Sequence, residues 1–163
     1  MSEVRFSEVR VAAVPAMRVA SFRVISPTPE DDAAAHARQW LAAHGLAAER
    51  FFGFDVAVTP EQERHDLRGY EVWAVLPPGV PSAGAAIRDV PGGLYAVMTV
   101  FDAFDDPFKW IPEGWKHLQH WVGRSAEYRA ADQQCLEEIV TDGRRRHLAV
   151  YYPVTAAWIE SAA

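Results

Sequence analysis

Hydrophobic and polar positions alternate along several short stretches of the chain, and each stretch is bounded by proline, glycine or aspartate. This period of two predicts strands, at about residues 17–25, 50–58, 69–76, 93–101, 133–141 and 147–154. Elsewhere the apolar residues recur every three or four positions, which predicts helices at about 33–45 and 113–124. The order strand, helix, strand, strand therefore occurs twice.

A weak sequence repeat accompanies this order. The segment "VPAMRVASFRV" (14–24) aligns with "VPGGLYAVMTV" (90–100) at an offset of 76 residues, and both begin with Val-Pro. Two βαββ repeats predict an α+β fold, in which a curved antiparallel sheet carries two helices on one face. We expect a single domain over residues 1–163, with halves at about 1–78 and 85–155, a linker at 79–84 and a ligand groove where the halves meet.

Strand alternation assigns side chains to the two faces of this sheet. In the strand at 69–76 the helix side takes Tyr70 and the apolar residues in register with it, which leaves Glu71 and Trp73 on the other face. In "QCLEEIV" (134–140) we expect Leu136 and Val140 under the helix.

The same alternation then places Cys135, Glu137 and Ile139 on the groove face. The face of Phe52 and Phe54 is left open by the pattern.

Glu71 and Glu137, one from each half, are thereby predicted to share a face with the rings of Trp73, Tyr95 and Tyr151. Aromatic rings and carboxylates suit a flat apolar ligand, including a cationic one. Burial without a partner would raise the pKa of either carboxyl and make it a candidate general acid or base. In the alternative interpretation the two glutamates face solvent or pair with a neighbour such as Arg23.

Composition narrows the class of protein. Half of the 163 residues are hydrophobic, 23% are charged and the net charge is −6, which favours a soluble globular protein and disfavours nucleic-acid binding. The single cysteine, Cys135, excludes an internal disulfide and suits the cytoplasm. No apolar run approaches the roughly 20 residues of a membrane span. We expect a monomer or a weak homodimer.

Other chemistries find little support in the sequence. His117 and His120 stand three residues apart, but no third ligand is predicted near them, so we expect no metal. No glycine-rich dinucleotide motif and no nucleophile elbow is present, so we expect no cofactor and no serine nucleophile.

Several segments together resemble the GyrI-like small-molecule-binding domains, which occur alone and as effector domains of bacterial transcription regulators. These segments are "RFFGF" (50–54), "GYEVW" (69–73), "VPGGLYAV" (90–97), "GWKHLQHWVGRSAEY" (114–128), "QQCLEEI" (133–139) and "VYYPV" (150–154). The resemblance implies a tandem βαββ fold and a buried glutamate that selects flat cationic aromatic compounds. By motif this glutamate is Glu137, and Glu71 falls where relatives often carry an acidic residue.

One subfamily, the cyclopropanoid cyclopropyl hydrolases, opens the cyclopropane of DNA-alkylating antibiotics, and "GYEVW" and "LEE" resemble that branch. The resemblance implies protection of the cell, with Glu71 or Glu137 acting on water and Tyr95 bonding the developing phenolate. The hypothesis places the ligand in a sandwich of Trp73, Tyr95, Tyr151 and Trp110, and Phe52 and Phe54 are further expected ligand-binding residues. The aromatic segment before the second helix predicts a lid of Phe104, Phe108, Trp110 and Trp115, with packing in the core as the alternative for Trp110 and Trp115. A non-catalytic sequestering or effector-binding protein is the chief alternative, and a protein-interaction role such as gyrase modulation is a third.

Overall fold

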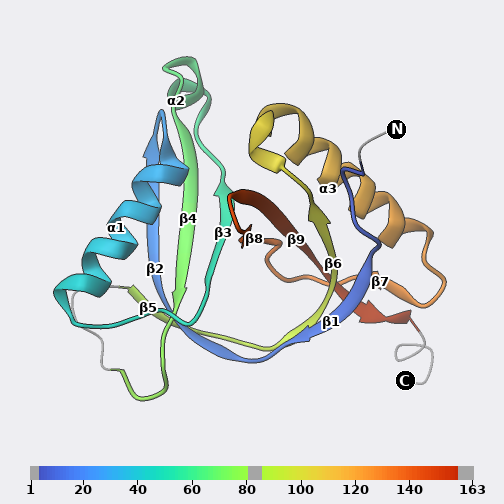
Figure 1. Cartoon of the computed structure of the whole chain (residues 1–163), viewed down its shortest axis with the longest axis horizontal. Helices are drawn as coiled ribbons and strands as arrows, with labels where there is room; N and C mark the ends of the chain where they lie inside the picture. The colour runs from blue at the N-terminus through green and yellow to red at the C-terminus, as the bar shows by residue number, and fades with distance from the viewer. Residues whose placement is uncertain (1–3, 81–85, 158–163) are drawn as a thin grey trace. The chain divides into compact units, whose positions relative to one another are not determined.

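The computed structural model describes residues 4–80 and 86–157, and its elements are shown in Figure 1. Residues 16–91 contain β2 (Met17–Ser26), α1 (Pro29–Ala43), β3 (Phe51–Val56), α2 (Pro60–Arg64), β4 (Arg68–Val75) and β5 (Ala86–Val90). The remaining elements are β1 (Arg10–Val14), β6 (Gly93–Val100), the short 3-10 helix η1 (Ala103–Asp105), α3 (Pro107–Arg124), β7 (Tyr128–Ala130), β8 (Leu136–Asp142) and β9 (Arg145–Ala156). The predicted α+β class and both βαββ repeats are confirmed.

The chain forms two compact units, which we call the first-repeat unit (residues 16–91) and the second-repeat unit (residues 4–15 and 92–157). The first-repeat unit has the strand order β3-β4-β2-β5, and the second has the order β8-β9-β6-β1, with β7 also paired to β9. All of these pairings are antiparallel. The units thus share one topology. The predicted linker at 79–84 lies outside the described residues from residue 81 onward.

In each unit, one edge strand comes from the other half of the sequence. β1 precedes the first Val-Pro and pairs with β6, whereas β5 precedes the second Val-Pro and pairs with β2. The two edge strands are related by the same 76-residue offset, since Arg10 and Ala86 are their first residues. The division of the chain into units therefore differs from the predicted halves at 1–78 and 85–155.

In the first-repeat unit the core lies where α1 packs on the sheet. Ala33, Ala37 and Leu41 of the helix pack against Val72 and Ala74 of β4. Their packing buries apolar surface, which stabilises the fold by roughly 25 cal/mol for each Å² buried. α1 begins at Pro29, earlier than predicted, because proline is tolerated in the first turn and Glu30, Asp31 and Asp32 favour the positive end of the helix dipole.

In the second-repeat unit α3 packs on β6 and β9. Leu118 and Val122 of the helix contact a cluster that includes Ala96, Met98 and Val150. Gly114 allows the close approach, since a Cβ at this position would stand 2.5 Å from Cγ2 of Val100.

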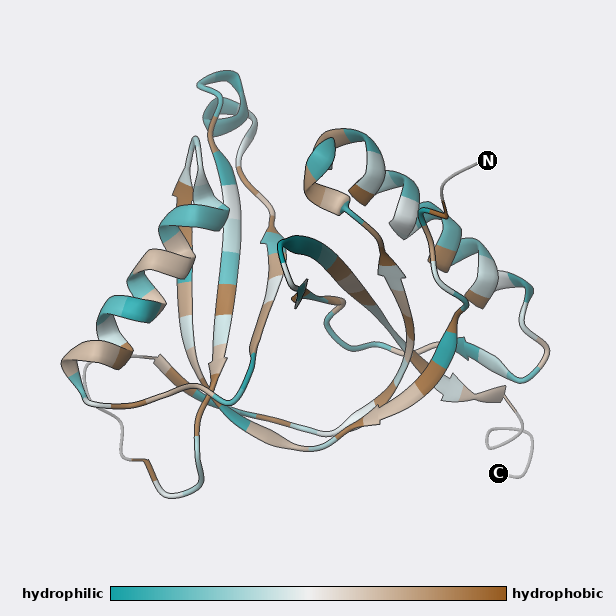
Figure 2. Ribbon diagram, in the orientation of Figure 1, coloured by the Kyte–Doolittle hydropathy of each residue, from teal (hydrophilic) through white to brown (hydrophobic). Residues whose placement is uncertain are grey.

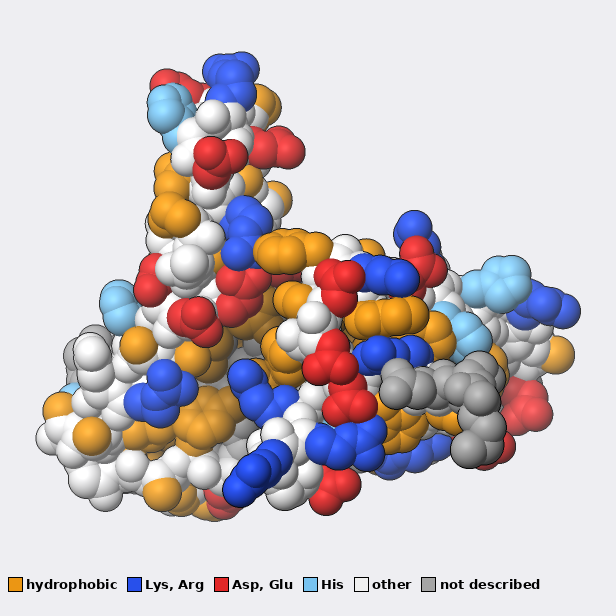
Figure 3. All heavy atoms as spheres, turned by 45° about the horizontal axis from the view of Figure 1, so that its top comes forward, with side chains coloured by type: hydrophobic (Ala, Val, Ile, Leu, Met, Phe, Trp, Pro, Cys, Tyr) orange, Lys and Arg blue, Asp and Glu red, His pale blue; other side chains and the backbone are white. Residues whose placement is uncertain are grey.

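Hydrophilic residues gather around α2, at the end of the β3–β4 hairpin (Figure 2), and the space-filling view shows charged side chains of both signs there (Figure 3). A capping box stabilises the amino end of this short helix: the Thr59 hydroxyl accepts from the backbone amide of Gln62, and the Gln62 side chain accepts from the backbone amide of Thr59. The polar segment at 59–71 therefore has a defined structure that its composition did not predict.

Candidate functional site

Glu71 lies on the face of the first-repeat sheet that is opposite α1, as predicted. In the ladder it stands opposite Arg23 of β2 and opposite Phe54 of β3, and directly paired residues share a face. Phe52 stands opposite Trp73 in the same way. The register thus assigns Phe52 and Phe54 to the face that the sequence left open.

The Glu71 carboxylate is buried and fully hydrogen-bonded, with only 2% of its side chain exposed. Arg23 Nε donates to Oε1 at 2.7 Å, and Trp73 Nε1 donates to Oε2 at 2.6 Å. Arg88 Nη1 also donates to Oε2, at 3.3 Å. We call Arg23, Glu71, Trp73 and Arg88 the Glu71 cluster.

The hydrogen bonds in this cluster decide the protonation state of Glu71. Burial by itself would raise the pKa of its carboxyl, but hydrogen bonds from Arg23, Trp73 and Ser21, with the charge of Arg23, lower the pKa below its ordinary value. The expectation of a raised pKa is therefore wrong, and the alternative of pairing with Arg23 is confirmed. An ionised carboxylate whose two oxygens are both occupied is a poor general base.

Aromatic rings surround the cluster within the same unit. Phe54 and Trp73 meet edge to face, with ring centroids 5.0 Å apart. The guanidinium carbon of Arg88 lies 5.5 Å from the Trp73 ring centroid, and that of Arg50 lies 4.6 Å from the Phe52 ring centroid. These are cation–π distances, so this sheet face combines flat apolar rings with positive charge.

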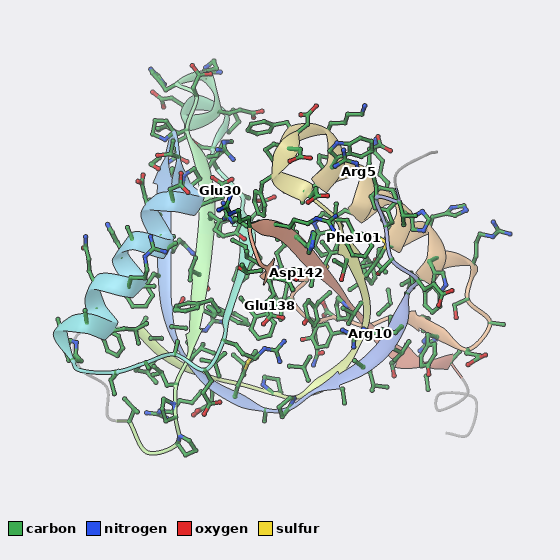
Figure 4. All side chains as sticks on the ribbon, in the orientation of Figure 1. Arg5, Arg10, Glu30, Phe101, Glu138 and Asp142 are labelled. Atoms are coloured by element: carbon green, nitrogen blue, oxygen red, sulfur yellow. The ribbon has the colours of Figure 1, made fainter. Side chains whose placement is uncertain are left out.

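The second-repeat unit carries a smaller cluster on the face of its sheet that is opposite α3. The rings of Tyr95 and Tyr151 meet edge to face with centroids 6.0 Å apart, and the Tyr151 hydroxyl donates to Oε1 of Glu138 at 2.7 Å. Figure 4 labels Glu138 on β8. Burial, and secondarily the neighbouring Cys135, raises the pKa of the Tyr95 phenol, which therefore remains a proton donor near neutral pH.

The predicted orientation of β8 is wrong by one residue. Leu136 stands opposite Tyr151 and Glu138 opposite Ala149, whereas Glu137 stands opposite Val150 of the α3-side core. Glu137 and Ile139 therefore lie on the helix-side face, and Leu136 and Val140 lie on the other one. A one-residue shift exchanges the two faces of a strand completely, and "LEE" offers two adjacent glutamates that the pattern does not distinguish.

The two clusters occupy corresponding places in the repeat. Trp73 stands opposite Ser21 and Tyr151 stands opposite Val97, and Ser21 and Val97 are related by the 76-residue offset. In each unit, this aromatic residue donates a hydrogen bond to a carboxylate on the helix-free face.

The predicted four-ring sandwich of Trp73, Tyr95, Tyr151 and Trp110 is contradicted for its last member. Trp110, Phe104 and Trp115 pack against the α3-side core, on the other face of the sheet from Tyr95 and Tyr151. Phe108 is 77% exposed. Arg5 and Lys109 both approach the Trp110 ring, each at 4.5 Å from its centroid. A ligand-binding role of Phe104, Phe108 and Trp115 stays a prediction.

A polar cluster that sequence analysis missed connects η1 to β9. Arg145 donates to both carboxylate oxygens of Asp102, at 3.0 and 2.6 Å, and the buried His147 accepts from the Asp102 amide at 2.9 Å. These contacts hold Asp102 in a left-handed conformation, with φ of 49°. Because Arg145 and His147 are more than 40 residues from Asp102, no local sequence pattern predicts these contacts.

The remaining candidates for other chemistries are Cys135, His117 and His120. Burial, and secondarily the charge of Glu137, raises the pKa of the Cys135 thiol, which disfavours a thiolate nucleophile. His117 and His120 are both exposed on α3. Within residues 4–80 and 86–157 no group of three or more His, Cys, Asp and Glu side chains is arranged to hold a metal ion. Over the same residues, no helix has the length and apolarity needed to cross a membrane.

No family model matches the sequence, and no curated protein matches it either. Solved structures do match. The C-terminal domain of EcmrR is similar over 91% of this chain and 97% of that domain, with a TM-score of 0.65 and 15% identity. EcmrR in its complex with DNA matches with the same TM-score and 14% identity, and there this chain spans 57% of the EcmrR chain.

SAV2435 bound to tetraphenylphosphonium is similar over 91% of this chain and 94% of its own, with a TM-score of 0.56 and 12% identity. At these identities the similarity concerns the fold. The chain therefore has the tandem βαββ fold of GyrI-like domains, as its sequence motifs implied.

Proposed function

We propose that this protein binds flat, largely apolar small molecules through the aromatic, helix-free faces of its two sheet units. The observation that carries the proposal is the composition of those faces. A sheet face without a covering helix normally alternates to polar side chains, but here it carries the buried rings of Phe52, Phe54 and Trp73 in one unit and of Tyr95 and Tyr151 in the other. Each ring set has a hydrogen-bonded carboxylate beside it.

One of the similar structures supports the binding of an aromatic small molecule by this fold. SAV2435 was solved with tetraphenylphosphonium, a bulky aromatic cation, and shares the fold of this chain. Because the sequences are only 12% identical, the similarity concerns the fold and does not identify side chains that contact a ligand. The proposal for this chain therefore rests on its own residues, and the comparison supports only the general class.

Calorimetric titration with 2-naphthamide, a flat neutral probe, and with tetraphenylphosphonium tests the proposal. Trp73→Leu removes a ring from the helix-free face and should weaken binding of 2-naphthamide by about tenfold or more. Trp40→Leu is the matched control, since Trp40 packs against the α1-side core of the same unit. The proposal fails if no probe binds saturably, or if the two substitutions have equal effects.

We further propose that hydrolysis of a cyclopropane in a DNA-alkylating compound follows binding, which would protect the cell. Tyr95 supports this second function, because a buried phenol that stays protonated is a suitable donor to a developing phenolate. Water would add across the strained carbon–carbon bond, with its hydroxyl on the opened carbon and its proton on the former dienone oxygen. Non-catalytic sequestration needs only the first part of the proposal.

Mass spectrometry separates the two functions. With protein far below the substrate concentration, an enzyme converts the whole pool to a product that is heavier by one water, whereas a binder depletes only a stoichiometric amount. Tyr95→Phe should slow turnover strongly, Glu138→Gln tests the carboxylate that accepts from Tyr151, and Glu137→Gln on the helix-side face is the control. Full turnover in both Tyr95→Phe and Glu138→Gln would refute the catalytic part of the proposal.

A further inference from the structure

The Glu71 cluster carries more positive than negative charge. It contains one carboxylate and two guanidinium groups, and arginine stays protonated at every pH at which the protein is folded. The lowered pKa of Glu71 keeps its single negative charge in place. The cluster therefore has a formal net charge of +1 near neutral pH.

The negative charge is hidden and the positive charges are presented. The Glu71 side chain is 2% exposed, whereas the side chains of Arg23 and Arg88 are 56% and 52% exposed. Glu71 engages only Nε of Arg23 and Nη1 of Arg88. Within the described part of the chain, the remaining N–H groups of these two arginines donate to no other protein group.

An approaching ligand thus meets hydrogen-bond donors next to a ring. The Arg88 guanidinium lies over Trp73, and the indole Nε1 of Trp73 donates to the same oxygen of Glu71, Oε2, as Arg88 does. Trp73 also contacts Phe54 edge to face, and these two rings are only 4% and 7% exposed, so the guanidinium groups form the accessible part of the cluster. A carboxylate or phenolate on a flat ring system could accept from the guanidinium groups while its rings stack on their planes.

We propose that the helix-free face of the first-repeat unit recognises planar aromatic anions, through Arg23 and Arg88, with Glu71 as the buried residue that positions both arginines. This inference rests on the proposed function and specifies its ligand class. It reverses the preference for cations that a carboxylate among rings suggests, because here the carboxylate is already neutralised and a cation would meet two guanidinium groups of like charge.

Three probes with one ring system test the charge preference: 2-naphthoate, 2-naphthamide and 2-naphthylmethylammonium. Binding is measured by calorimetry near neutral pH, at low and at high salt. We expect 2-naphthoate to bind about tenfold more tightly than 2-naphthamide, and 2-naphthylmethylammonium to bind most weakly. The advantage of the anion should shrink as salt is added, because both arginine side chains are half exposed.

Substitutions assign the preference to the cluster. Arg88→Gln and Arg23→Gln should each remove most of the tenfold advantage of 2-naphthoate and leave the affinity for 2-naphthamide nearly unchanged. Arg144→Gln is the matched control, because Arg144 is exposed in the turn between β8 and β9 and is outside the cluster.

Glu71→Gln is the decisive variant. It raises the formal charge of the cluster from +1 to +2 and keeps a side-chain oxygen that can accept from Arg23, so we expect 2-naphthoate to bind more tightly. If Glu71 instead recognised cations, the same substitution would abolish binding of 2-naphthylmethylammonium and leave 2-naphthoate unaffected.

The outcomes separate this inference from the proposed function. If 2-naphthamide binds but 2-naphthoate binds no more tightly, the inference is overturned and the proposed function stands. If none of the three probes binds, both are overturned. If the anion preference persists in both Arg88→Gln and Arg23→Gln, the site has been assigned to the wrong residues. Loss of the preference in both variants, with no change in Arg144→Gln, is the expected result.

Discussion

Replacing Arg23 with glutamine tests how much the Glu71 cluster contributes to the stability of the fold. The substitution removes the charge-assisted hydrogen bond from Nε to Oε1, which is 2.7 Å long, and leaves Glu71 with Trp73, Ser21 and the longer contact to Arg88. A hydrogen bond to a charged group contributes about 1.5–3 kcal/mol. Because Arg23 is 56% exposed, solvent screens part of this interaction, and we expect a loss of about 1–2 kcal/mol.

The loss should depend on pH in one direction. The pKa of Glu71 is lowered in the folded protein, so its stabilisation is fully present above the unfolded pKa, about 4.3, and disappears as pH falls through the lower folded value. In Arg23→Gln the folded pKa rises toward the unfolded one. The difference in stability between the two proteins should therefore be constant from pH 7 to about pH 5 and should shrink below about pH 4.

Urea unfolding followed by circular dichroism measures this difference at each pH. A change of midpoint with an unchanged slope reports stability, and in thermal unfolding 1 kcal/mol should correspond to about 2–4 °C for a protein of this size. Arg144→Gln, which changes the same charge outside the cluster, should leave stability unchanged. A difference between Arg23→Gln and the parent protein that stays the same down to pH 3 would refute an electrostatic role for Arg23.

Two further predictions concern packing and reactivity. Gly114→Ala should destabilise the protein by about 1–3 kcal/mol, because the added Cβ would stand 2.5 Å from Val100 Cγ2. Gly123→Ala on the same helix adds a Cβ that meets nothing within 4 Å, and it should stabilise the protein by up to about 1 kcal/mol. Equal effects of the two substitutions on the urea midpoint would contradict the described packing of α3. Partial burial, and secondarily the charge of Glu137, raises the pKa of the Cys135 thiol, so its alkylation rate with iodoacetamide should still be rising above about pH 9. A plateau below pH 8 would contradict this raised pKa.

Local pattern was enough to predict the central elements of both units. The strands at 17–25 and 69–76 and their repeats at 93–101 and 147–154 agree with β2, β4, β6 and β9 to within a few residues. The start of α3 was placed too late because Pro112 resembles a helix breaker, although it lies inside the helix, where it removes one backbone hydrogen bond. β1 and β5 were missed because they are short edge strands without a clear alternation.

The sequence predicted the face of Glu71 correctly and the face of Glu137 wrongly. The face of Glu71 follows from alternation in "GYEVW", where one side is clearly apolar, and the structure confirms it. In "LEE" the alternation allows either Glu137 or Glu138 on the helix-free face. Only the pairing of β8 with β9 shows that Glu138 is the carboxylate beside the tyrosines. The lid expected from Phe104 and Trp110 depended on composition, which does not say which core an aromatic residue joins.

The sequence by itself determined the repeated order of elements, the α+β class and the presence of rings and carboxylates on alternating strands, because these depend on residues close together in the chain. Only the tertiary structure decided that Glu71 is neutralised, since its partners Arg23 and Arg88 lie on different strands, 48 and 17 residues away. A carboxylate takes its charge state, and with it the ligand that it favours, from whatever surrounds it in space. Local periodicity carries no information about those distant partners.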